Sequence, residues 1–132
     1  MTTLQAINQA IKHDGTTLEV IKNDNVTPLF KNVTGGYVVA RKAPSVDVFV
    51  QLTSGNARDT LHGALNLFYD LALQNGAKVG IWHDKTKDKD NLLCFTFDLV
   101  ETYTSKTYAL HRGRLHKQVA IFNLDTFQEI YL

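Results

Sequence analysis

The sequence predicts an α+β fold: a mostly antiparallel sheet of five to seven strands, a long central helix packed on one face, and one or two short helices. Three observations support this fold class. One long segment repeats its apolar residues at the helical period of 3.6. Several shorter segments on either side of it are rich in β-branched and aromatic residues. Turn signals separate most of these segments. At 132 residues the chain fits one α+β domain that spans residues 1–132.

The chain begins with a predicted helix from about Thr3 to His13, because apolar residues recur there at helical spacing. Asp14–Gly15 ends that pattern. Leu18–Ile21 is typical of a strand, and the turn-rich stretch Lys22–Asn25 follows it. Pro28 interrupts the next segment, which leaves an edge strand or a loop.

The middle of the chain predicts two strands and then the central helix. Tyr37–Ala40 forms the first strand segment, and the second, Val46–Leu52, alternates apolar with other residues after Pro44. The helix runs from about Asn56 to Asn75, and Gly76 ends it. One face of this helix is apolar and is expected to pack on the sheet; its residues are Ala57, Leu61, Ala64, Leu65, Phe68, Leu71 and Ala72.

The second half of the chain predicts further strands. Lys78–Trp82 is one, the charged stretch Asp84–Asn91 is a loop, and Leu92–Tyr103 is a strongly β-prone strand. This last strand has four large apolar residues on one face: Leu93, Phe95, Phe97 and Leu99.

The segment 105–118 allows two interpretations. Ser105 is a suitable N-cap for a helix, but Gly113 weakens that helix by about 1 kcal/mol. The alternative is a hairpin strand that continues from the preceding one; we favour the helix. Val119–Phe122 and Glu129–Leu132 then form the closing strands, with a turn near residues 123–125.

The tail from Ser105–Lys106 through Gly113–Arg114 to Gln118–Leu124 resembles the C-terminal part of small uncharacterised phage and prophage proteins. The shared features are a short helix and then a Gln-x-Ala-Ile-x-x-Leu run that opens a hairpin. The resemblance covers the C-terminal quarter of the chain. It implies an accessory protein of a phage or mobile element and carries over no catalytic residue.

Composition limits the classes of function. The net charge is +1, with fourteen Lys and Arg against thirteen Asp and Glu, whereas a dedicated duplex-DNA binder has a clear basic excess. Cys94 is the only cysteine, so no internal disulfide forms and a reducing compartment is expected. The first residues do not resemble a signal peptide, and no stretch approaches the roughly 20 apolar residues that span a bilayer. We therefore expect a cytoplasmic protein without a membrane partner.

No motif for catalysis or cofactor binding is present in the sequence. It lacks a P-loop, a Gly-x-Gly-x-x-Gly, a Cys-x-x-Cys pair and a His-Glu-x-x-His. His83–Asp84, with Asp88 nearby, suits a metal or acid–base site, but Lys85 and Lys87 compete for these acids and favour a solvated loop. We predict a protein that is not an enzyme and that has no metal and no cofactor.

Two groups of residues are candidates for binding. The first is a cluster between Ser105 and Gln118 that contains no acid: Lys106, His111, Arg112, Arg114, His116 and Lys117. Such a cluster suits phosphates or an acidic protein surface, and on a helix Arg112 and His116 are one turn apart and positioned to grip one ligand. The alternative is a solvated face.

The second candidate is a stripe on the central helix: His62, Tyr69 and Leu73, which lie beside the core face rather than in it. Few charges accompany this stripe, which suggests a protein contact or a dimer seam. The alternative is burial under the first helix or a long loop.

These observations favour a small non-enzymatic binding protein that acts by protein–protein interaction, for example as an inhibitor of a host defence factor. The partner would be a host protein or a second copy of the chain. The alternative is a nucleic-acid-binding protein that uses the basic segment 106–117, for which the affinity falls steeply with salt.

Overall fold

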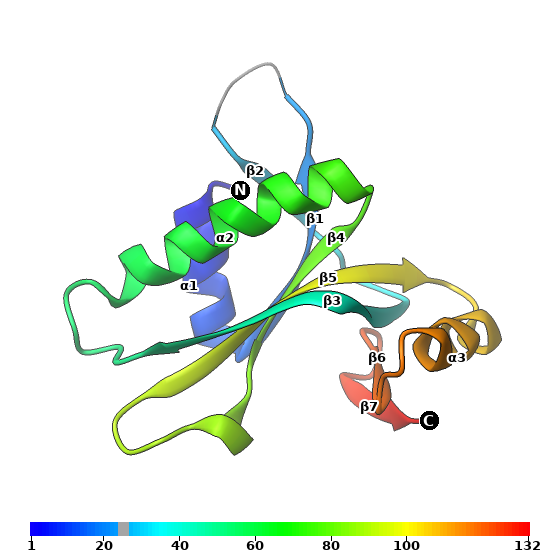
Figure 1. Ribbon diagram of the computed structural model, residues 1–132. Coiled ribbons are helices and arrows are strands. Elements are labelled where there is room, and N and C mark those ends of the chain that lie inside the picture. Colours follow the sequence, from blue (N-terminus) through cyan, green and yellow to red (C-terminus); the bar gives the residue numbers. More distant parts are fainter. Residues whose placement is uncertain (24–26) are drawn as a thin grey trace.

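Seven antiparallel strands form one curled sheet in the order β2–β1–β4–β5–β3–β6–β7, and three helices accompany it (Figure 1). The computed structural model describes residues 1–23 and 27–132, so Asp24 and Asn25 of the predicted turn lie outside the described residues. The elements are α1 (Thr3–His13), β1 (Gly15–Ile21), β2 (Leu29–Asn32), β3 (Tyr37–Val50), α2 (Ala57–Asn75), β4 (Lys78–His83), the 3₁₀ helix η1 (Lys85–Lys87), β5 (Leu93–Tyr103), α3 (Lys106–Leu115), β6 (Ala120–Asn123) and β7 (Gln128–Tyr131).

The α+β fold class and the antiparallel sheet are confirmed, but two details of the prediction are wrong. The two strand segments on either side of Pro44 belong to one strand, β3, whose register on β5 shifts between Ala40 and Ser45. Pro44 is tolerated because it lies in that irregular stretch, where the ladder is already interrupted. The long central helix is also not found: α2 has 19 residues and shares its face of the sheet with α1.

The main core lies between the sheet and the pair α1 and α2. Odd-numbered side chains of β5 point to this side, as the alternation of a strand requires. They meet the apolar stripe of α2, whose predicted core positions Leu61, Leu65 and Phe68 are fully buried. Phe68 contacts Phe97 with ring centroids 5.8 Å apart. This packing fixes the end of α2 near the last residues of β5.

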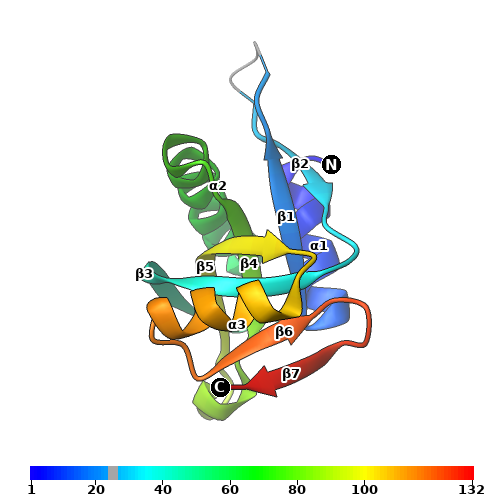
Figure 2. The same cartoon turned by 90° about the vertical axis from the view of Figure 1, so that its right-hand side faces the viewer.

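A smaller core lies on the opposite face of the sheet. Val38 and Val100 are buried there against Leu124 from the turn that joins β6 to β7. The Trp82 ring lies beside the Phe122 ring, with centroids 5.5 Å apart. The C-terminal hairpin β6–β7 therefore folds back on the sheet and extends it, as Figure 2 shows.

The segment 105–118 contains a helix, α3, rather than a strand, as favoured. The Ser105 hydroxyl caps α3 by accepting the Tyr108 N–H at 3.2 Å. The packing of the helix explains Gly113, because a Cβ at this position would lie 2.9 Å from side-chain atoms of Ile121 and Leu132. The glycine that weakens the isolated helix thus lets α3 approach the C-terminal hairpin closely (Figure 2).

Candidate protein-binding surface on helix α3

The inner face of α3 is held to the sheet by one buried carboxylate. Glu101 of β5 accepts Arg112 Nε on Oε1 at 2.8 Å and Arg112 Nη2 on Oε2 at 2.9 Å. Arg41 Nε of β3 reaches Oε2 at 3.1 Å, and the Tyr103 hydroxyl donates to Oε1. His116 Nε2 lies 3.1 Å from Oε2, while its Nδ1 accepts the Lys42 N–H at 3.4 Å. Arg112 and His116 are thus brought together, but on the Glu101 side chain of the protein itself.

The charges of this anchor stabilise the ionised form of Glu101. The hydrogen bonds from Arg112 lower the pKa of Glu101 from 4.5 to about 2; burial opposes that shift, and Tyr103 and His116 add to it. The same contact raises the pKa of Arg112. Burial and the nearby carboxylate raise the pKa of the Tyr103 hydroxyl. Glu101 therefore acts as a charged tether for α3.

The outer face of α3 carries an exposed stripe of aromatic and aliphatic residues. Tyr108 and Leu115 are 50% and 57% exposed, and His111 lies between them at helical spacing. The Tyr108 ring packs edge-on against Tyr103, with centroids 4.9 Å apart, so its orientation is fixed. Three basic side chains of this segment are also exposed: Lys106, Arg114 and Lys117. Within the described residues, none of these three side chains takes part in a hydrogen bond or ion pair.

A hollow of about 410 Å³ adjoins this face. It lies between the end of α2, the end of β5 and the start of α3, and Arg41, Arg112, Tyr103 and Tyr108 line it with Glu101. Its lining is polar, and both guanidinium groups bond to the Glu101 carboxylate.

The residues of the second candidate group do not form one exposed surface. His62 is half-buried and bonds to Asn66, which in turn accepts the Thr3 hydroxyl from α1. Tyr69 is only 6% exposed; its hydroxyl donates to the Ile21 carbonyl at 2.7 Å. The β1–β2 hairpin covers Tyr69, so the alternative of burial applies to this residue.

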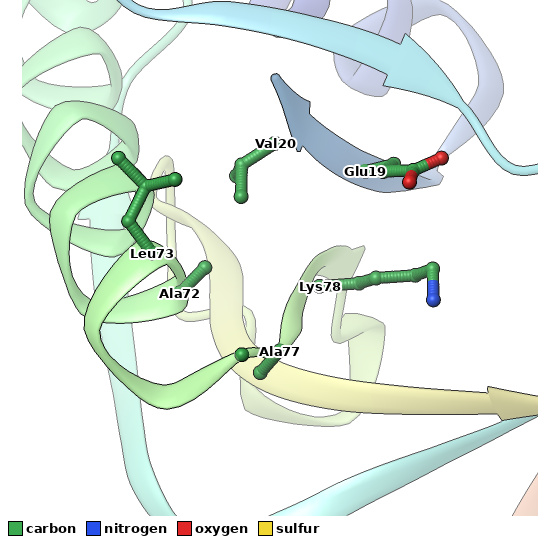
Figure 3. A pocket seen from close by; sticks show the side chains of 7 residues that line it. Glu19, Val20, Ala72, Leu73, Ala77 and Lys78 are labelled. Carbon is green, nitrogen blue, oxygen red and sulfur yellow. The ribbon is translucent and has the colours of Figure 1, made fainter. Parts of the chain in front are cut away.

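Leu73 lies one helical turn after Tyr69 and lines a hollow of about 250 Å³ between β1 and the end of α2. Figure 3 shows Leu73 facing Val20, while the charged ends of Glu19 and Lys78 lie away from them. Of the three residues only Leu73 is exposed, at 39%.

The loop after β4 is a set of ion pairs. His83 lies between Asp14 and Asp88, with its Nδ1 3.3 Å and its Nε2 2.8 Å from their carboxylate oxygens. The bond to Lys85, with a further one to His83, lowers the pKa of Asp14, and the Cys94 N–H lowers that of Asp88. Within residues 1–23 and 27–132 there is no cluster of three or more His, Cys, Asp or Glu placed to hold a metal.

Glu101, Arg41 and Tyr103 were not predicted from the sequence. A signal for Glu101 is nevertheless present, because it follows Leu93, Phe95, Phe97 and Leu99 at the same alternate spacing. An acid in such a buried series requires a cation. The spacing does not identify the cations that pair with Glu101, since Arg41 and Arg112 come from different elements.

Comparison of this chain with protein-family models, with curated proteins and with solved structures gives no match. In the part of the chain that the structure describes, no helix is long and apolar enough to cross a membrane.

Proposed function

We propose that this chain is a small non-enzymatic binding protein that docks on another protein through the outer face of α3. The observation that carries the proposal is the exposed Tyr108–His111–Leu115 stripe; together with the exposed cations Lys106, Arg114 and Lys117 of the same segment it is called the α3 surface. Aromatic and aliphatic side chains with basic neighbours are typical of the centre and rim of a protein interface. The complementary partner presents an apolar groove with acidic groups around it.

The placement of the basic residues favours a protein over a nucleic acid as the binding partner. Arg112 and His116 are engaged by Glu101, so less of their charge is offered to a phosphate backbone. Three cations of the segment remain exposed: Lys106, Arg114 and Lys117. An accessory role for a phage or mobile element, such as inhibition of a host defence factor, is part of this proposal and rests on the resemblance of the C-terminal quarter.

Capture from a cell extract with the tagged chain tests the proposal, with and without nuclease treatment. We expect a stoichiometric protein that survives nuclease and moderate salt. Leu115→Ala should weaken its capture about tenfold, as loss of an interface anchor does. Leu67→Ala on α2 is the matched control, because Leu67 is similarly exposed (53%) and lies outside the α3 surface.

Two results would contradict the proposal. Co-eluting nucleic acid that nuclease or moderate salt removes would support the alternative function, in which phosphate contacts release counterions. Equal capture by the Leu115→Ala and Leu67→Ala variants would show that the partner binds elsewhere.

A further inference from the structure

The two edges of the sheet differ in whether their outer backbone groups are paired. At the β2 edge, Phe30 N–H donates to the Met1 carbonyl at 2.9 Å, and the Met1 nitrogen donates to the Phe30 carbonyl at 2.7 Å. Gln9 of α1 also bonds to the Asn32 side chain. β2 also carries a lysine, Lys31, and a charge on an edge strand discourages pairing with another strand. The first residues of the chain therefore close this edge, in the way that natural sheets protect their edges.

The β7 edge has no such cover in the described residues. β7 pairs only with β6, through a register that includes Ile130 opposite Ile121, and Leu132 N–H donates to the Val119 carbonyl at 2.9 Å. Because inward and outward backbone groups alternate along an antiparallel strand, those of Glu129 and Tyr131 point away from β6. Tyr131 is 70% exposed, and no lysine or proline lies in the strand.

We propose that β7 pairs with β7 of a second copy of the chain, so that two sheets join edge to edge about a two-fold axis at Ile130. In this register Glu129 lies opposite Tyr131 of the second copy, and the outward backbone groups of both residues are satisfied. No like charges face each other. A register centred on Glu129 would instead place two carboxylates opposite each other, which is unfavourable.

Both faces of the joined strands support this pairing. Within one chain the Tyr131 hydroxyl donates to Glu129 Oε2 at 2.7 Å. The two side chains therefore lie on the same face of β7. Ile130 lies on the other face, where it packs half-buried beside Ile121 and α3. On the axis it would meet Ile130 of the second copy at the close spacing of a non-hydrogen-bonded pair.

The register leads to a test with matched substitutions at one position. Tyr131→Glu would place a carboxylate opposite the Glu129 carboxylate of the second copy, whereas Tyr131→Lys would place an ammonium group there. Both changes remove the same aromatic ring. Because the pair occurs twice in the interface, we expect Tyr131→Glu to raise the dimer dissociation constant at least about tenfold relative to Tyr131→Lys. The double change Glu129→Lys with Tyr131→Glu should restore the dimer.

Sedimentation velocity over a range of protein concentrations measures these constants, and circular dichroism checks that each variant is folded. A wild-type chain that remains monomeric at every concentration would overturn the proposal. Equal association of the Tyr131→Glu and Tyr131→Lys variants would overturn the register. The Leu115→Ala chain should still dimerise, so failure of the dimer and failure of docking through the α3 surface are distinguishable.

Discussion

The replacement Glu101→Gln tests whether one carboxylate anchors α3. It keeps the shape of the side chain and removes the charge that Arg41, Arg112 and His116 share. A fall of the pKa from 4.5 to about 2 corresponds to roughly 3 kcal/mol of stability at about 1.4 kcal/mol for each pH unit. The side chains of Arg41 and Arg112 are 24% and 27% exposed, so solvent screening reduces this value to about 2 kcal/mol.

Urea denaturation measures the change. With a slope of about 1.5 kcal/mol per molar urea, the midpoint of Glu101→Gln should fall by roughly 1–1.5 M at neutral pH. The pH dependence has a definite sign. Because the folded-state pKa lies below the unfolded-state value, the stabilisation is complete above about pH 4.5 and is lost as the pH falls toward about 2.

The wild type and the Glu101→Gln variant should therefore converge in stability as the pH falls from about 4.5 to about 2. Glu19→Gln, an exposed acid on β1, is the control and should change the midpoint little at any pH. A Glu101→Gln variant as stable as the wild type at neutral pH refutes the anchor. A deficit that persists undiminished at pH 2 refutes its electrostatic origin.

Three further substitutions are predicted to change the free energy of unfolding, each measured by urea denaturation. Gly63→Ala in α2 should stabilise by about 0.5–1 kcal/mol, since a Cβ there meets nothing within 4 Å, and destabilisation would contradict this. Gly36→Ala should destabilise by about 1–3 kcal/mol, because φ is +88° and the Cβ would lie 2.7 Å from the Tyr103 carbonyl oxygen; a neutral effect would count against the β2–β3 turn as described. Thr17→Val should stabilise by about 1 kcal/mol, because the buried Thr17 hydroxyl finds no hydrogen-bond partner among the described residues, and a loss of stability would indicate one.

Local patterns account for the elements that were predicted well. The spacing of Leu4, Ile7 and Ile11 and the alternation along β5 each depend on residues close in the sequence, and α1 and β5 have nearly the predicted bounds. The N-terminus of the first helix is also set by residues close in the sequence, because Thr2 and Gln5 form a capping box there. Patterns of this kind identify which face of an element is buried without knowledge of its neighbours.

The remaining features depend on which elements meet, and the sequence does not determine that locally. Tyr69 lies at the border of the apolar face of α2, so its burial is decided by the β1–β2 hairpin, whose Phe30 ring meets it edge-on at 5.5 Å. Arg112 and Arg114 are two residues apart and carry the same charge, yet of the two only Arg112 faces Glu101. The division of the basic cluster into an inner and an outer set therefore required the position of α3 on the sheet.

This division connects stability with the proposed binding. Glu101 and the close approach at Gly113 hold the inner face of α3, so the outer stripe is presented by a helix that is already fixed. A fixed surface loses less conformational entropy on docking. Loss of the Glu101 charge should consequently weaken partner binding as well as folding, whereas Leu115→Ala removes an exposed contact and should affect binding alone. If a folded Glu101→Gln chain binds the partner as tightly as the wild type does, the Glu101 anchor does not contribute to binding through the α3 surface.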